Sequence, residues 1–231
     1  MTIKKTIAIA SAKGGVGKST VCSFLATALS KDSKVGILDA DIYGPNQDIL
    51  FDIDDKNIEV DKKNTDRPYI PKKVDNISIN SLGFLLDKSA AIWRGPMLSS
   101  AINQIYEKTN WDELDFLLID MPPGTGDAYL TVCQKIVPDY VILVSTVSKL
   151  SIADLRRSEY VFASLNTKVL GIILNNIHQS CDFQSFNLET ENTILDRVEY
   201  DKKFIDSTYP FDDLRLDSLF VNTIRTIKEY E

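Results

Sequence analysis

The sequence predicts an α/β fold built on a mostly parallel, twisted sheet with helices on both of its faces. Short apolar segments rich in β-branched residues alternate along the chain with longer segments of helical period, which is the pattern of successive βαβ units. The apolar segments are those expected of strands that are buried on both faces. A chain of 231 residues, 44% of them hydrophobic, is long enough for one such core, so we expect a single domain over residues 1–231.

Seven apolar segments are predicted as strands, the last of them on a weaker pattern. They are Thr6–Ala10, Val35–Leu38, Ile77–Leu82, Phe116–Ile119, Val141–Val144, Val169–Leu174 and Leu195–Val198. Helices are expected to begin near Lys18, Pro96, Ala128, Ile152 and Leu216. Two polar stretches, at about 51–76 and 175–193, interrupt the alternation and are predicted to be exposed.

Charge and cysteine content disfavour several classes of partner. Lys and Arg total 26 against 33 Asp and Glu, so the chain carries a formal charge of −7 and a pI near 4.9. No broad basic face is then expected for nucleic acid or for anionic lipid. The longest apolar runs are far shorter than the roughly twenty residues of a membrane-spanning helix, and we expect no membrane partner. Three widely separated cysteines, an odd number, favour a reducing, cytoplasmic location.

The segment SAKGGVGKST, from Ser11 to Thr20, has the composition of a phosphate-binding loop. It lies directly after a predicted strand and before a predicted helix, which is the context that such a loop requires. Its glycines let backbone N–H groups turn toward phosphate oxygens, Lys18 supplies a positive charge, and the Ser19 hydroxyl is placed to ligate Mg²⁺. Alanine replaces the first glycine of the strict motif, and a second lysine lies inside the loop. The predicted nucleotide-binding residues are Ala12, Lys13, Gly14, Gly15, Val16, Gly17, Lys18, Ser19 and Thr20.

Carboxylates follow two of the predicted strands. Asp39 and Asp41 come directly after the second strand, and Asp120 ends the fourth. Because ligands of open α/β sheets gather at the carboxyl ends of the strands, we expect all three carboxylates to face a nucleotide, with Asp120 holding hydrated Mg²⁺ opposite Ser19. Helix capping is the alternative role for the first two, and it suits Asp39 better. The turn Met121–Asp127, MPPGTGD, is predicted to be a switch that senses the γ-phosphate.

Four segments together resemble the Mrp/ApbC family of iron-sulfur cluster carrier ATPases. They are KGGVGKS from Lys13, LDADIYGP from Leu38, IWRGPM from Ile92 and DMPPGTGD from Asp120. The similarity spans about residues 3–176, and Trp93–Pro96 distinguishes this family from its MinD and ParA relatives, which share the deviant P-loop. The resemblance implies a P-loop NTPase fold and a Mg-ATP hydrolase that works as a homodimer. It also implies a role in iron-sulfur cluster assembly or delivery, with a scaffold or recipient apoprotein as partner.

The same resemblance assigns roles to individual residues. Lys13 would reach across the homodimer to the nucleotide of the partner subunit, as an arginine finger does. Asp41 would orient the attacking water, and Asn175 would contact adenine. The expected catalytic residues are Lys13, Lys18, Asp41 and Asp120, and the expected Mg²⁺ site is formed by Ser19 and Asp120.

The chain departs from the family at the cluster-binding segment. Where members carry Cys-x-x-Cys, so that a dimer supplies four thiolates to a [4Fe-4S] cluster, this sequence reads Cys181-Asp-Phe-Gln184. An amide is a poor iron ligand, so a dimer would present two thiolates, from Cys181 of each subunit. His178 leaves open a set of two cysteines and two histidines, with a solvated loop histidine as the alternative. The second interpretation is therefore a nucleotide-switched adaptor, or a positioning ATPase like MinD and ParA, that has lost the cluster.

Two further features concern packing. Cys22 and Cys133 fall on predicted helices and are expected to be small buried residues. The segment from Leu216 to Ile227 has apolar residues at three- and four-residue spacing, which predicts an amphipathic helix. MinD relatives bind membranes through such a helix, but here its charges balance, so we expect it to pack against the domain.

Overall fold

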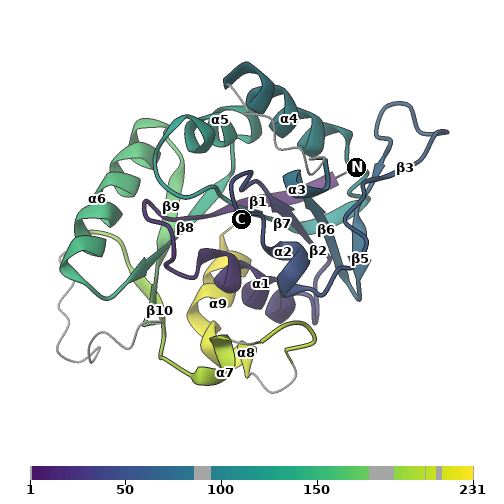
Figure 1. Ribbon diagram of the computed structural model, residues 1–231. Helices are drawn as coiled ribbons and strands as arrows, with labels where there is room; N and C mark the ends of the chain where they lie inside the picture. The colour runs from purple at the N-terminus through teal and green to yellow at the C-terminus, as the bar shows by residue number, and fades with distance from the viewer. Residues whose placement is uncertain (1, 86–94, 177–189, 206, 212–214, 231) are drawn as a thin grey trace.

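A sheet of eight strands organises the computed structural model, which describes residues 2–85, 95–176, 190–205, 207–211 and 215–230. The strands lie in the order β10-β9-β8-β1-β7-β2-β6-β5, and every neighbouring pair is parallel except β5 with β6. They are β1 (Thr2–Ala10), β2 (Val35–Asp39), β5 (Lys72–Val74), β6 (Ile77–Ser81), β7 (Glu113–Asp120), β8 (Tyr140–Thr146), β9 (Lys168–Asn175) and β10 (Ile194–Val198). All seven predicted strands are present, and the mostly parallel α/β class is confirmed (Figure 1).

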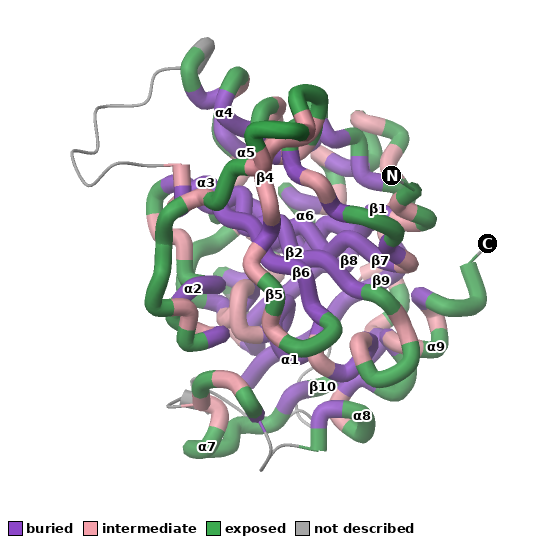
Figure 2. The backbone as a smooth tube through the Cα atoms, turned by 90° about the vertical axis from the view of Figure 1, so that its right-hand side faces the viewer, coloured by how far each residue is buried: buried purple, intermediate pink, exposed green. Residues whose placement is uncertain are grey.

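Helices cover the sheet on both faces (Figures 1 and 2). On one face lie α4 (Gly95–Lys108), α5 (Asp127–Ile136) and α6 (Lys149–Ser164), and on the other lie α1 (Lys18–Leu29), α8 (Leu216–Leu219) and α9 (Val221–Glu229). Successive residues of β1 alternate between the two cores: Ile7 and Ile9 pack toward α1, whereas Ala8 and Ala10 pack on the opposite face. Both faces of the second half of β1 are thus buried, which is why Ile7–Ala10 is apolar without interruption, whereas the start of the strand carries Lys4 and Lys5.

The first polar stretch is less exposed than its composition predicts. Phe51 is only 3% exposed and belongs to the core, so the prediction is wrong at that end. At the other end β5 pairs antiparallel with β6 and forms an edge of the sheet, with the exposed Lys73 on it. Between them β3 (Glu59–Val60) and β4 (Tyr69–Ile70) form a separate two-stranded hairpin. The short helices α2 (Gln47–Leu50), α3 (Leu82–Leu85) and α7 (Lys202–Ile205) were likewise not predicted.

The C-terminal segment forms two helices rather than the single one expected. The chain leaves helical geometry at Phe220, between α8 and α9. Leu216, Phe220 and Ile227 are at most 3% exposed and lie in the core beside α1. The prediction that this segment packs against the domain is confirmed.

Side chains from distant strands fix the position of α9. Asp196 of β10 accepts hydrogen bonds through Oδ2 from the backbone N–H (2.8 Å) and the hydroxyl (2.7 Å) of Thr223, in the first turn of α9. This contact caps the helix, whose own preceding residue provides no side-chain cap. At the other end, Lys5 of β1 donates to the Ile227 carbonyl at 3.2 Å. Among the described residues, none of the helices combines the length and the apolar character that a membrane crossing demands.

Candidate functional site

The glycine-rich loop connects β1 to α1 at the carboxyl edge of the sheet. Gly15 and Gly17 have φ angles of +76° and +81°, in the left-handed region that side chains disfavour, and Gly17 immediately precedes α1. The first N–H groups of α1 therefore face a cleft of about 280 Å³. Its lining residues are Ser11, Lys13, Gly14, Gly15, Gly17, Lys18, Ser19, Thr20, Asp41, Asn46, Ile49, Leu50 and Pro123.

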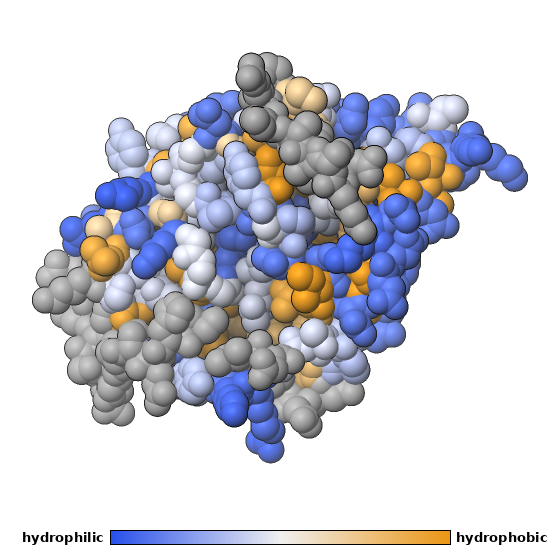
Figure 3. Space-filling view, viewed as in Figure 1, coloured by the Kyte–Doolittle hydropathy of each residue, from blue (hydrophilic) through white to orange (hydrophobic). Residues whose placement is uncertain are grey.

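All predicted loop residues except Ala12 and Val16 line this cleft. Those two residues instead border a small cavity on the other side of the loop, against α6, and Val16 is 3% exposed. Lys13 is exposed and borders both spaces, together with Asp154 of α6 in the second. Apolar side chains gather over α2 beside the cleft (Figure 3), where Ile49 is 58% exposed.

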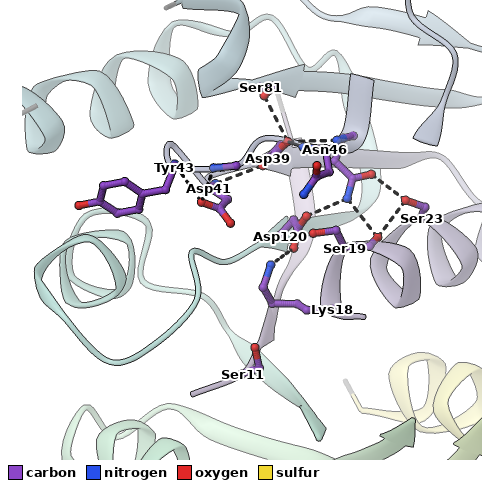
Figure 4. A network of polar contacts seen from close by, with 12 residues as sticks. Ser11, Lys18, Ser19, Ser23, Asp39, Asp41, Tyr43, Asn46, Ser81 and Asp120 are labelled. Carbon is purple, nitrogen blue, oxygen red and sulfur yellow. Dashed lines mark hydrogen bonds and ion pairs between the residues drawn. The ribbon is translucent and has the colours of Figure 1, made fainter. Parts of the chain in front are cut away.

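Lys18 and Asp120 form a buried ion pair in the middle of the site (Figure 4). The ammonium nitrogen of Lys18 donates to Asp120 Oδ1, and the two side chains are 6% and 0% exposed. Burial alone would lower the pKa of Lys18, but the charges of Asp120, Asp39 and Asp41 outweigh it and raise this pKa above its usual value. Lys18 therefore carries its charge while it is enclosed by carboxylates.

The second oxygen of Asp120 is held by a residue that the sequence did not single out. The Gln47 carboxamide nitrogen donates to Asp120 Oδ2 at 2.8 Å and to the Ser19 carbonyl at 3.2 Å. Its carbonyl oxygen accepts from the Ser23 hydroxyl at 2.8 Å. Gln47 lies in a four-residue helix after the second predicted strand, between the polar residues Asn46 and Asp48, and no sequence signal distinguishes it from them.

Asp39 and Asp41 have different roles, although both follow β2. Asp39 is 0% exposed and does not line the cleft, so the expectation that it faces the nucleotide is wrong. Its Oδ2 accepts from the backbone N–H groups of Asn46 (3.1 Å) and Gln47 (3.2 Å), at the start of α2, and from the Ser81 hydroxyl. The alternative role as a helix cap is therefore confirmed for Asp39 (Figure 4).

Strand register explains the electrostatics of Asp39. Asp39 and Asp120 are paired neighbours at the ends of β2 and β7, both without access to solvent. Burial first, and the charge of Asp120 second, raise the pKa of Asp39 to about 8. The carboxyl edge of the sheet thus concentrates acidic groups around a single buried lysine.

Asp41 lies on the wall of the cleft, as predicted. It is 7% exposed, and its Oδ1 accepts from the backbone N–H groups of Tyr43 (3.0 Å) and Gly44 (3.2 Å). These two bonds fix the side chain against its own turn (Figure 4). The carboxylate is thus presented to the same space as Lys18 and Ser19.

The donor set in this cleft fits Mg²⁺ bound together with a nucleotide. Ser19 lines the cleft in the first turn of α1, and Asp120 lies behind Lys18 at the end of the neighbouring strand, so a hydroxyl and, once Lys18 moves from it, a carboxylate would be the oxygen ligands. Among the described residues, no group of three or more histidine, cysteine and acidic side chains is arranged to hold a metal by itself. Mg²⁺ is usually held by one or two carboxylates and by the phosphates of its substrate, which agrees with this arrangement.

Asn175 ends β9 next to the phosphate loop. Its side-chain nitrogen donates to the Val16 carbonyl at 2.9 Å, so Asn175 supports the loop from behind. It also borders a narrow apolar space with Phe24, Tyr200 and Phe204. The predicted contact with adenine remains a prediction.

The switch turn touches the phosphate loop directly. The Gly124 N–H donates to the Ser11 carbonyl at 3.2 Å, and Pro123 lines the cleft. Trp93, His178, Cys181 and Gln184 lie outside the described residues. Cys22 and Cys133 are 0% and 5% exposed, and burial raises the pKa of each thiol, so their prediction as buried residues is confirmed.

A larger cleft of about 740 Å³ lies at the opposite edge of the sheet, where β2 and β7 begin. Its charged residues are engaged in surface ion pairs: the Lys34 ammonium lies 3.5 Å from Glu113, Lys73 lies 3.4 Å from Asp112, and Asp32 and Asp115 pair with Lys228 and Lys4 outside the cleft. The glycine-rich loop, the buried lysine Lys18 and the expected metal ligand Ser19 line the smaller cleft, and Asp120 is paired with that lysine. We therefore assign the functional site to the carboxyl edge.

Curated relatives of this chain share one description. A family model described as the NUBPL iron-transfer P-loop NTPase matches residues 2–202. The iron-sulfur cluster carrier protein of Rickettsia felis is 47% identical over 175 residues, which are 75% of this chain and 54% of that protein. The protein of the same description from Aquifex aeolicus is 41% identical over 182 residues, 78% of this chain and 49% of that protein. This chain spans about half the length of these relatives.

Solved structures agree with the fold. The nucleotide-binding protein of Archaeoglobus fulgidus in complex with ADP has a TM-score of 0.72 and 30% identity, over 99% of this chain and 89% of that chain. The cell division ATPase MinD of Pyrococcus furiosus has the same TM-score of 0.72 at 19% identity, over 99% and 100% of the two chains, and shows the fold alone. The resemblance to Mrp/ApbC carriers is confirmed by the family match over most of the sequence. With this sheet, phosphate loop and pair of acidic strand ends, the chain belongs to the ParA family described as the NUBPL iron-transfer P-loop NTPase.

Proposed function

We propose that this protein binds Mg-ATP, hydrolyses it slowly as a homodimer, and acts in the assembly or delivery of iron-sulfur clusters. The observation that carries the nucleotide function is that Lys18 and Asp41 line the cleft of the glycine-rich loop, with the buried Asp120 paired to Lys18 behind it. The cluster function is supported by the description of the relatives as iron-sulfur cluster carrier proteins. This chain spans about half of their length, so the activity of these longer relatives is proposed, not established, for this chain.

The contacts between the residues of the site suggest how they act. Phosphate oxygens would replace Asp120 as the partner of Lys18, which already carries its charge within the cleft. Asp120 would then be released to hold the metal, which neutralises phosphate charge when it is bound. Asp41, fixed by two backbone hydrogen bonds, would orient the attacking water. Lys13, exposed at the rim, would stabilise charge on the nucleotide of the partner subunit.

Nucleotide titration and phosphate release test the first part of the proposal. The wild-type protein is expected to bind Mg-ADP and to release phosphate from ATP, whereas a Lys18→Met variant should do neither. A Lys13→Ala variant should still bind Mg-ADP but should lose phosphate release and ATP-dependent dimers, which light scattering would detect. A folded wild-type protein that gives no heat with either nucleotide would refute the proposal.

The carrier function and its alternative differ in one measurement. Gln184 stands where family members carry the second cysteine, and this replacement favours a nucleotide-switched adaptor that holds no cluster. Anaerobic reconstitution with iron and sulfide, followed by metal analysis, separates the two functions. Cluster uptake by the wild-type protein supports the carrier, whereas uptake by a Gln184→Cys variant alone supports the adaptor.

A further inference from the structure

We propose that Gln47 is a positioning residue for the metal site: its carboxamide holds the Asp120 carboxylate in the orientation that receives Mg²⁺ with the nucleotide. The inference rests on the proposed nucleotide function and adds a residue to it. Gln47 lies outside the glycine-rich loop, the strand-end carboxylates and the switch turn on which the sequence analysis relied.

The Gln47 side chain is fully enclosed, and both ends of its carboxamide are engaged. It is 0% exposed, and its nitrogen divides its two hydrogens between Asp120 Oδ2 and the Ser19 carbonyl. Because a carboxylate and a carbonyl can only accept, these two partners fix which end of the amide is nitrogen, and the oxygen accepts from the Ser23 hydroxyl. The Gln47 backbone N–H is held in turn by Asp39. A buried amide with its hydrogen bonds satisfied in this way has one orientation.

That orientation determines which oxygen of Asp120 is available. Oδ2 is bound to Gln47, so the carboxylate is fixed and Oδ1 points to Lys18, which lines the cleft. When phosphate oxygens draw Lys18 away, Oδ1 is the oxygen that becomes free on the cleft side. Without Gln47 the Asp120 carboxylate would rotate about its Cβ–Cγ bond, and it would have to adopt the orientation that Mg²⁺ requires during binding.

A neutral donor suits this place better than a charged one. Asp39, Asp41 and Asp120 already surround the single ammonium group of Lys18. A glutamate at position 47 would add a fourth carboxylate without access to solvent, and a lysine would compete with the metal for Asp120. An amide donates to the carboxylate and leaves its charge for the cation. The same nitrogen also holds the Ser19 carbonyl, so one side chain links both expected metal ligands.

The test is the coupling between Mg²⁺ and ADP, measured by calorimetric titration of ADP in EDTA and in excess Mg²⁺. The ratio of the two dissociation constants states how much the metal strengthens nucleotide binding. In a Gln47→Met variant, which keeps the shape of the side chain, this ratio is expected to fall by about tenfold or more. The dissociation constant in EDTA should change by less than about threefold, because the phosphate loop is untouched.

Two further variants separate positioning from stability. Asn80→Leu also removes a buried amide, one that donates to Thr109 at 2.7 Å and does not contact Asp120, so the coupling should stay at its wild-type value. Ser23→Ala removes the donor to the Gln47 oxygen and should lower the coupling in the same direction by a smaller factor. If Gln47→Met does not fold, the coupling between Mg²⁺ and ADP measured in Ser23→Ala tests the inference by itself.

The possible outcomes point to different conclusions. If Gln47→Met weakens ADP binding equally with and without Mg²⁺, the role of Gln47 is purely structural and the inference is overturned. Coupling that stays at its wild-type value in both Gln47→Met and Ser23→Ala would also overturn it. If the wild-type protein binds no ADP, the proposed function fails as well. If the wild-type protein binds Mg-ADP and the coupling in Gln47→Met equals the wild-type value, only the role of Gln47 is refuted and the proposed function stands.

Discussion

Replacing Lys18 by methionine should destabilise the nucleotide-free protein far more than replacing Asp120 by asparagine. Both substitutions nearly preserve side-chain volume and both remove one charge from the same buried pair, whose members are 6% and 0% exposed. Without Lys18, however, Asp41 and Asp120 lose the cation that they share, and Asp39, whose pKa is already raised to about 8, loses it too wherever it is ionised. Without the charge of Asp120, Lys18 keeps its attraction to Asp39 and Asp41, and Asp39 is relieved of repulsion.

The magnitudes follow from this asymmetry. Removing one partner of a buried ion pair and leaving the other unpaired costs about 3–5 kcal/mol, which we expect for Lys18→Met. For Asp120→Asn we expect about 1–2 kcal/mol, the cost of weakening the hydrogen bonds from Lys18 and Gln47. With a urea m-value of about 3 kcal/mol per molar, the unfolding midpoints should fall by about 1–1.7 M and about 0.3–0.7 M.

Urea unfolding of the nucleotide-free protein, followed by circular dichroism, is the appropriate assay. Lys31→Met serves as the control, since Lys31 and its partner Asp217 are each 59% exposed and their ion pair should leave the midpoint nearly unchanged. A midpoint for Asp120→Asn that falls as far as that of Lys18→Met, or further, would refute the charge balance described for the site.

Three other predictions concern the surroundings of the site. Folding raises the pKa of Asp39 to about 8, so the folded protein binds a proton at Asp39 more tightly than the unfolded chain does. The stability that this proton contributes is therefore lost as pH rises from about 4 to about 8. Urea midpoints between pH 5.5 and 8.5 should therefore fall less in Asp39→Asn than in the wild-type protein, and parallel curves would contradict this. Asn175→Ala removes the hydrogen bond to the Val16 carbonyl, worth about 1 kcal/mol, and should weaken ADP binding about fivefold in calorimetry; unchanged affinity would mean that the loop needs no such support. Asp196→Ala leaves Thr223 and the start of α9 without their acceptor and should lower stability by about 1–3 kcal/mol, with faster hydrogen exchange in α9 than elsewhere as its signature.

The strands were predictable because their environment leaves few choices of sequence. The segment Ile7–Ala10 of the central strand β1 is covered by helices on both faces, and an uninterrupted apolar run satisfies both cores there. The hairpin of β3 and β4 has two residues in each strand, and β5 has three, so neither carries a readable pattern. Edge pairing of this kind depends on the neighbouring strand more than on local preference.

Within the site, the phosphate loop was predictable and the division of labour between the carboxylates was not. A phosphate loop is a local structure whose glycines and lysine are adjacent in the sequence. The role of Asp39 depends on α2, a helix of four residues that no periodicity reveals, and on the Ser81 hydroxyl, which comes from the next strand of the sheet. Gln47 contacts residues 24 and 73 positions away, so its importance arises only in the folded chain.

The antiparallel edge strand β5 restricts how copies of this protein can meet. Strand-to-strand extension of a sheet needs a flat, uncharged border, whereas this one carries Lys72 and Lys73 in a strand of three residues, and hydrophilic side chains predominate over it (Figure 3). A second molecule that docked there would have to strip water from an ammonium group. Such a rim disfavours the stacking of crowded molecules into fibrils through this edge of the sheet.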